Sequence, residues 1–267
     1  MPRIKAGSIS INYETYGEGE PLLLIMGFGM PGAAWLPSLP MLTGFKCIYF
    51  DNRGTGDTDK PDGAYTIPDM AEDASNLFAA LGIAKAKVFG VSMGGMIAQE
   101  LTLRHPGQVT KLVLGCTTAG GPTAKMAAPE VGAQLVGAFA LMQTDIDKAL
   151  DQILPVLYPP AFIAAHPEVK EFMKVAMKQV PPTPPASIAA TAVGVQQFNA
   201  YERLDQIKCP VLIVHGELDV LVPPENAHII KSRIPHAELF MIANAGHGFQ
   251  AADPMGINAR IVEWLKS

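Results

Sequence analysis

The 267-residue chain contains little cysteine and no excess of positive charge. Its three cysteines, Cys47, Cys116 and Cys209, are an odd number at wide spacing and form no Cys-x-x-Cys pair. This pattern indicates buried free thiols in a reducing compartment and argues against a disulfide framework. The formal net charge is −5, so the chain offers no basic stripe for phosphate groups, and nucleic acid is not expected as a partner.

The chain also lacks an uninterrupted apolar segment that could cross a membrane. Its longest charge-free stretch, from Pro21 to Phe45, contains four prolines and four glycines, which would interrupt a spanning helix. The N-terminal segment MPRIKAGSIS has no apolar core of the kind found in signal peptides. We therefore expect a soluble, cytoplasmic protein that does not bind membranes.

Apolar residues are plentiful: 49 % of the chain is hydrophobic and only 17 % is charged, which predicts a packed core. Continuous apolar runs, typical of strands buried on both faces, alternate with segments of helical periodicity. This alternation predicts a parallel sheet covered by helices on both faces. The predicted strands are 8–16, which has the pattern of a hairpin, 22–26, 47–50, 87–91, 111–116, 211–214 and 238–242. The predicted helices around them are 68–81, 93–105, 223–233 and 254–266, the last with Asp253 as its cap and Pro254 in its first turn.

One region interrupts the alternation. Residues 120–200 contain ten of the 23 prolines, no arginine and no convincing strand. Short helices are predicted there at about 129–143, 145–158, 167–179 and 185–199, and the run from Pro181 to Pro185 is typical of a stiff extended connector. We therefore divide the chain into a core of residues 1–119 and 201–267 and a helical insert of residues 120–200.

Ser92 lies in the pattern Gly90-Val91-Ser92-Met93-Gly94, which follows a predicted buried strand and opens a predicted helix. In this context Gly-x-Ser-x-Gly is typical of a nucleophile elbow, a strained turn that exposes the serine at the carboxyl edge of the sheet. Small residues must flank the serine, and Gly90 and Gly94 meet that need. A chance glycine-rich turn is the alternative, and the strand–turn–helix context disfavours it.

A serine nucleophile needs a base, and the base needs an orienting carboxylate. Of the six histidines, His247 lies between the last predicted strand and the last helix, flanked by glycines, where its ring can reach Ser92. Asp219 follows the penultimate strand and is the predicted carboxylate. Glu217, which lies closer to that strand, is the competing candidate.

The tetrahedral intermediate of an acyl transfer needs hydrogen-bond donors aimed at its oxyanion. One predicted donor is the backbone N–H of Met93, the residue after the nucleophile. The other is the N–H of Phe28, in the loop Met26-Gly27-Phe28-Gly29 after the first buried strand. The two glycines let this backbone turn inward, although they could also be ordinary turn residues.

Together these residues resemble the α/β-hydrolase superfamily over essentially the whole chain. The matching landmarks are the elbow at Ser92, the His-Gly-x-x-Asp segment ending at Asp219, the Gly246-His247 pair and the order Ser, Asp, His along the chain. The segment 51–56 is similar to the family's Asp-x-Arg-Gly-x-Gly turn, which is largely structural, so its charged residues are not assigned to catalysis. Many members have His-Gly where this chain has Met26-Gly27. Because the oxyanion donor is a backbone N–H group, we expect the oxyanion-binding site, or oxyanion hole, to tolerate this difference in side chain.

The resemblance implies an α/β-hydrolase fold with a mostly parallel central sheet of about eight strands, helices on both faces and a helical cap between two late strands. It also implies hydrolysis of carboxylic esters or lactones through an acyl-enzyme, without a metal or organic cofactor. Members similar to this chain include carboxylesterases, enol-lactonases and N-acyl-homoserine lactonases. Haloalkane dehalogenases and epoxide hydrolases also resemble it, but they carry aspartate where this chain has Ser92.

The composition of the insert favours a neutral small-molecule substrate. A fixed guanidinium would suit a dicarboxylate lactone or a coenzyme A thioester, and the insert has no arginine. Its lysines are typical of solvated helix faces. We expect a short- or medium-chain ester or lactone. Trp35 and Phe249, next to motif residues, are predicted to contact it, with ordinary core packing as the alternative for Trp35.

Three rival functions would use the same residues. A cofactor-free perhydrolase or a carbon–carbon bond hydrolase needs the same serine, histidine and aspartate. A ligand sensor built on this fold would retain the three groups but turn over slowly, so turnover separates it from an enzyme.

Overall fold

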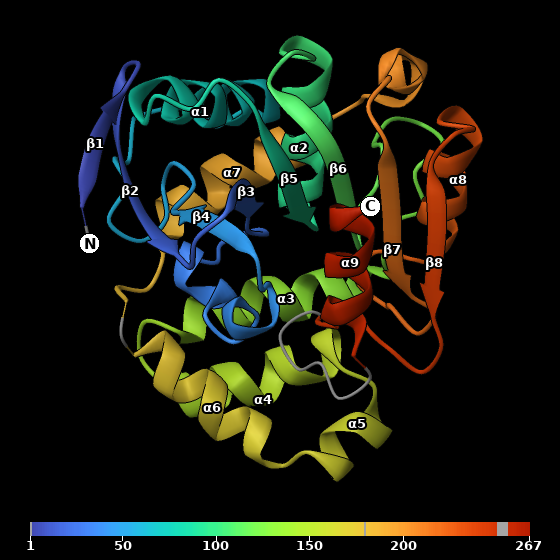
Figure 1. Cartoon of the computed structure of the whole chain (residues 1–267). Coiled ribbons are helices and arrows are strands. Elements are labelled where there is room, and N and C mark those ends of the chain that lie inside the picture. The colour runs from blue at the N-terminus through green and yellow to red at the C-terminus, as the bar shows by residue number, and fades with distance from the viewer. Residues whose placement is uncertain (1, 179, 250–255) are drawn as a thin grey trace.

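The computed structural model describes residues 2–178, 180–249 and 256–267. Its strands are β1 (Arg3–Ala6), β2 (Ile9–Tyr16), β3 (Glu20–Ile25), β4 (Phe45–Phe50), β5 (Ala86–Val91), β6 (Val109–Gly115), β7 (Val211–Gly216) and β8 (Glu238–Ile242). They form one eight-stranded sheet in the order β1-β2-β4-β3-β5-β6-β7-β8 (Figure 1). The β1–β2 and β2–β4 pairs are antiparallel, and the other neighbouring pairs are parallel. The predicted mostly parallel sheet of about eight strands is confirmed.

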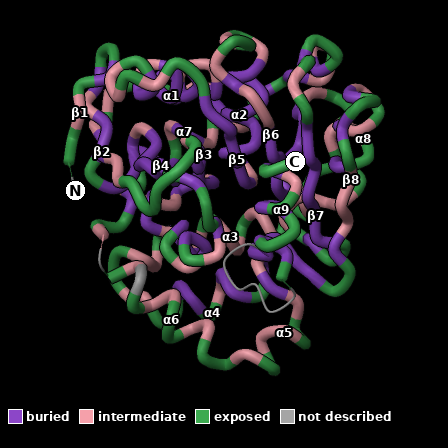
Figure 2. Tube along the Cα trace, viewed as in Figure 1, coloured by how far each residue is buried: buried purple, intermediate pink, exposed green. Residues whose placement is uncertain are grey.

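The central strands are buried on both faces, and successive residues contribute to two different cores. On β5, Val88 packs into the core on one side of the sheet and Phe89 into the core on the other. This follows from the pleat, which points successive side chains to opposite faces. Figure 2 shows the central strands as mostly buried, and β5 and β7 are buried along their whole length.

Helices cover both faces of the sheet, as predicted. Three of them, α1 (Ile67–Ala80), α2 (Met93–Arg104) and α8 (Glu225–Arg233), contribute buried side chains to the core that contains Val88, and α9 (Ile257–Lys266) contributes to the core that contains Phe89. A capping box starts α1: the Thr66 side chain accepts from the Asp69 N–H, and the Asp69 side chain accepts from the Thr66 N–H. The predicted start of the last helix, at Asp253 and Pro254, lies outside the described residues.

The stretch between β6 and β7 is helical, as predicted. It contains α3 (Pro129–Leu141), α4 (Ile146–Leu157), α5 (Pro160–Ala165), α6 (Glu168–Met177) and α7 (Pro185–Gln197). Figure 1 shows α3 to α6 gathered beyond the carboxyl ends of the parallel strands. Two elements were not predicted from the sequence, β1 and α5, which are only four and six residues long. The backbone before α7 is extended at Pro184, as expected for a proline-rich connector.

The helices α3 to α6 of the insert lie next to the edge of the sheet where the predicted catalytic side chains are found. The division into a core and an insert of residues 120–200 stays a prediction. Among the described residues, none of the helices has the length and apolar composition needed to span a bilayer.

Candidate active site

Ser92 lies between β5 and α2 in a strained turn. Its φ of +56° is in the left-handed region, which residues other than glycine rarely adopt. The turn is crowded: a Cβ on Gly90 would lie 2.2 Å from the Gly94 carbonyl oxygen, and a Cβ on Gly94 would lie 2.1 Å from the Ile25 carbonyl oxygen. The flanking glycines of the motif are therefore required by close backbone contacts.

His247 and Asp219 form a buried hydrogen-bonded pair, with 2.8 Å between His247 Nδ1 and Asp219 Oδ2. Burial opposes the charged carboxylate, but His247 and the hydrogen bonds from His215 and His247 outweigh it, so the pKa of Asp219 falls to about 2. Burial likewise opposes the imidazolium, but the charge of Asp219 outweighs it, with the adjoining Cys116 acting in the same direction. The pKa of His247 therefore lies well above its ordinary value.

The other oxygen of Asp219 is held by the backbone. Oδ1 accepts hydrogen bonds from the N–H groups of Leu221 at 2.9 Å and Val222 at 2.8 Å. His215 Nε2 lies 3.2 Å from Oδ2 and 2.8 Å from the Val222 carbonyl oxygen. Because it contacts two acceptors, this nitrogen carries the proton. These bonds fix Asp219 in the orientation that His247 requires.

His215 is a member of the site that was not predicted from the sequence. A titratable residue at the carboxyl end of a buried strand, four positions before Asp219, is the signal that could have indicated this role. The competing carboxylate, Glu217, is exposed in the same loop, whereas Asp219 is buried.

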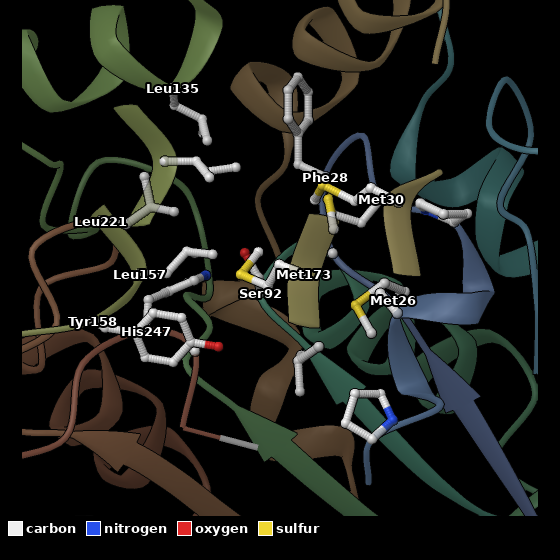
Figure 3. A pocket seen from close by; sticks show the side chains of 18 of the residues that line it. Met26, Phe28, Met30, Ser92, Leu135, Leu157, Tyr158, Met173, Leu221 and His247 are labelled. Atoms are coloured by element: carbon white, nitrogen blue, oxygen red, sulfur yellow. The ribbon is translucent and has the colours of Figure 1, made fainter. Parts of the chain in front are cut away.

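Ser92 and His247 line the same cavity, and Figure 3 shows the two side chains turned toward each other. The hydrogen bonds among the described residues do not include one between the serine hydroxyl and the ring. Since Nδ1 is engaged by Asp219, Nε2 is the nitrogen available to Ser92. The structure thus brings together the three residues that the sequence motifs predict.

The predicted oxyanion donors lie on two elements next to Ser92. Met93 is the first residue of α2, and amides in the first turn of a helix have no acceptor within it and attract negative charge. Phe28 lies in the loop after β3, and within the described residues its N–H makes no hydrogen bond. The preceding residue, Gly27, is so close that a Cβ there would lie 3.1 Å from the Ser92 Cβ. The loop backbone therefore reaches the serine.

The cavity has a volume of about 140 Å³ and is apolar. Its lining comes from the loop after β3 and from the insert, including Met26, Phe28, Met30, Leu135, Leu157 and Met173 (Figure 3). Besides Ser92 and His247, the lining contains the side chains of Tyr158 and Cys116, and its described part includes no aspartate, glutamate, lysine or arginine. Tyr158 could not be predicted from the sequence, because its place depends on how the insert packs on the sheet.

The predicted substrate contacts of Trp35 and Phe249 are corrected by the structure. Trp35 is fully buried and packs against Phe89 with ring centroids 4.9 Å apart. Phe249 is 3 % exposed and belongs to the same core. Neither is among the described lining of the cavity. Proximity in sequence to a motif residue did not fix the direction of the side chain.

Charged side chains of the insert lie away from the cavity. Lys170 and Lys174 of α6 form ion pairs with Asp151 and Asp147 of α4, at 2.5 and 2.7 Å. The described residues contain no group of three His, Cys, Asp or Glu side chains placed to hold a metal ion.

The sequence profile of the alpha/beta hydrolase fold matches residues 20–254. The chain belongs to this family. This alpha/beta hydrolase is 30 % identical to RutD of Caulobacter vibrioides, provisionally named a carbamate hydrolase, over 100 % of this chain and 99 % of that protein. Among solved structures it is similar to a thermophilic esterase from Thermogutta terrifontis, with 26 % identity, a TM-score of 0.82 and coverage of 99 % and 97 % of the two chains. It is also similar to Est816, described as an N-acyl homoserine lactone degrading enzyme, with 30 % identity, a TM-score of 0.78 and coverage of 99 % of both chains.

Proposed function

We propose that this hydrolase cleaves neutral carboxylic esters or lactones with short to medium apolar acyl groups, through a Ser92–His247–Asp219 triad and an acyl-enzyme. The observation that carries the proposal is that a strained serine lines one apolar cavity together with a histidine that is hydrogen-bonded to a buried aspartate. Such an arrangement activates a hydroxyl that is otherwise a weak nucleophile.

The chemistry follows from these positions. His247 Nε2 takes the Ser92 proton as the oxygen attacks the substrate carbonyl carbon, and Asp219 stabilises the imidazolium that forms. The N–H groups of Phe28 and Met93 donate to the oxyanion. His247 then gives its proton to the leaving alcohol, and water activated by the same ring releases the acid and regenerates Ser92.

The apolar cavity supports an uncharged substrate, because an unpaired carboxylate or phosphate there would lose its hydration without compensation. The relatives described as an esterase and as a lactone-degrading enzyme support the same class. Leu135, Leu157 and Met173 come from three helices of the insert, which supports a cap role for residues 120–200. The free cysteines support a reducing compartment such as the cytoplasm.

The test is hydrolysis of p-nitrophenyl butyrate and of an N-acyl-homoserine lactone by the wild type and by Ser92→Ala. We expect many turnovers by the wild type and a kcat lower by about 10⁵- to 10⁶-fold in the variant. The ratio of the two kcat/KM values then distinguishes an esterase from a lactonase. Wild-type activity no higher than that of Ser92→Ala on both substrates, or near-stoichiometric product, would contradict the proposal and favour a carbon–carbon hydrolase or a sensor.

A further inference from the structure

The loop that carries Phe28 is held at its two ends by the core. At one end, Asn52 Nδ2 donates to the Met26 carbonyl oxygen at 3.0 Å. At the other, the Gly32 N–H donates to Asp51 Oδ1 at 2.7 Å. Asn52 and Asp51 are buried, so both anchors are shielded from water.

The middle of the same loop is held by the insert. The Thr183 hydroxyl, from the connector before α7, donates to the Gly29 carbonyl oxygen at 2.9 Å. Phe139 of α3 and Ile188 of α7 pack so closely that a Cβ on Gly29 would lie 2.7 and 2.8 Å from them. Gly29 has a φ of +68°, which glycine adopts without strain. The position of this peptide thus depends on the insert.

A chain of hydrogen bonds leads from Thr183 to the predicted oxyanion donor. The carbonyl of Gly29 and the N–H of Met30 belong to one peptide unit, and that N–H donates to the Gly27 carbonyl oxygen at 3.4 Å. The Gly27 carbonyl and the Phe28 N–H belong to one peptide unit in turn. Each bond orients and polarises the next donor, because hydrogen-bonded peptide units strengthen one another.

We propose that Thr183 is a positioning residue for the oxyanion hole. Its hydroxyl fixes the Gly29–Met30 peptide, which through the Gly27 carbonyl sets the direction of the Phe28 N–H. Gln143, which follows α3, holds Thr183 in turn: its Nε2 donates to the Thr183 carbonyl oxygen at 3.0 Å. The inference rests on the proposed serine-hydrolase function and gives the insert a role in catalysis besides enclosing the substrate.

The test compares Thr183→Val, which keeps the shape and removes the donor, with Thr183→Ser, which keeps the donor. We expect Thr183→Val to lower kcat on p-nitrophenyl butyrate by about 5- to 30-fold with KM within about twofold, less than the 10²- to 10³-fold cost of losing an oxyanion donor outright. Thr183→Ser should restore most of the rate. The affinity for a phenylboronic acid, whose tetrahedral adduct places an oxygen in the hole, should fall in Thr183→Val by a similar factor.

Thr191→Val is the matched control. Its hydroxyl is also buried in the insert, but it donates to a carbonyl of α7 itself, that of Ser187 at 2.8 Å, and not to the loop. We expect this variant to keep the wild-type kcat and boronate affinity.

The positioning role is overturned if the wild type is active and Thr183→Val keeps its kcat and boronate affinity, or if Thr183→Ser is impaired as severely as Thr183→Val. A merely structural role would raise KM and lower the melting temperature while leaving kcat unchanged. A wild type no more active than Ser92→Ala would instead overturn the serine-hydrolase function, and the positioning role with it.

Discussion

Replacing Asp219 with asparagine tests the orientation of the base, because the structure dictates how the new amide must sit. Oδ1 receives two backbone N–H groups, from Leu221 and Val222, so the amide oxygen has to occupy this position. The NH₂ group then takes the place of Oδ2, 2.8 Å from His247 Nδ1. There it donates to the ring and leaves the ring proton on Nε2, which can no longer accept the proton of Ser92.

Because the histidine would then carry its proton on the wrong nitrogen, we expect kcat to be lower by about 10⁴-fold. The NH₂ group also faces the proton of His215 Nε2, 3.2 Å from the same position, so we expect a lower free energy of unfolding as well. Steady-state kinetics on p-nitrophenyl butyrate and urea unfolding measure the two effects separately.

Glu217→Gln is the matched control, since Glu217 is a carboxylate in the same loop but exposed to solvent. We expect wild-type kcat from this variant. An Asp219→Asn variant with nearly full activity, or a Glu217→Gln variant that loses it, would refute the assignment and make Glu217 the orienting carboxylate.

Three further predictions follow from the same geometry. Asp219 raises the pKa of His247, and the ring must be neutral to act as a base. The value of kcat/KM should therefore rise with pH, with a midpoint above 6.5, the ordinary pKa of histidine. A midpoint below 6.5 in the pH–rate profile would contradict this. Phe139 lines both the cavity at Ser92 and a second cavity of about 300 Å³, so Phe139→Ala should join the two cavities. We expect the ratio of kcat/KM for octanoate esters to kcat/KM for butyrate esters to rise by about tenfold, and the free energy of unfolding to fall by about 3 kcal/mol. An unchanged ratio would show that the ring does not limit chain length. Trp35 is fully buried, so Trp35→Ala should lower the free energy of unfolding in urea by about 3–5 kcal/mol while KM stays within twofold of the wild-type value. A large change in KM with unchanged stability would instead indicate that Trp35 contacts the substrate.

The fold could be predicted from the sequence because its signals are local. A strand buried on both faces is a continuous apolar run, and β8 begins and ends at the predicted residues, Glu238 and Ile242. The elbow depends on a few adjacent residues, so Ser92 could be assigned from its immediate neighbours. His247 and Asp219 could be found because parallel strands bring their carboxyl ends to one edge, whatever the packing elsewhere.

The lining of the cavity could not be predicted, because it depends on contacts between distant segments. Trp35 belongs to a short 3-10 helix, Gly32–Trp35, and its side chain turns toward Phe89 in the core. Tyr158 and Met173 reach the cavity only because the insert packs beyond the sheet edge. The bond from Thr183 to Gly29 joins residues 154 positions apart and has no signal in the local sequence.

The most direct test of the central claim is covalent trapping of the nucleophile. The protein would be incubated with an alkyl fluorophosphonate, and the site of modification would be located by peptide mass spectrometry in the wild type and in Ser92→Ala. The proposed mechanism predicts one phosphonate per chain, on Ser92, with loss of ester hydrolysis in the same proportion and no adduct on the variant. Labelling of another residue, or full hydrolysis by a protein that takes up no phosphonate, would contradict the role of Ser92.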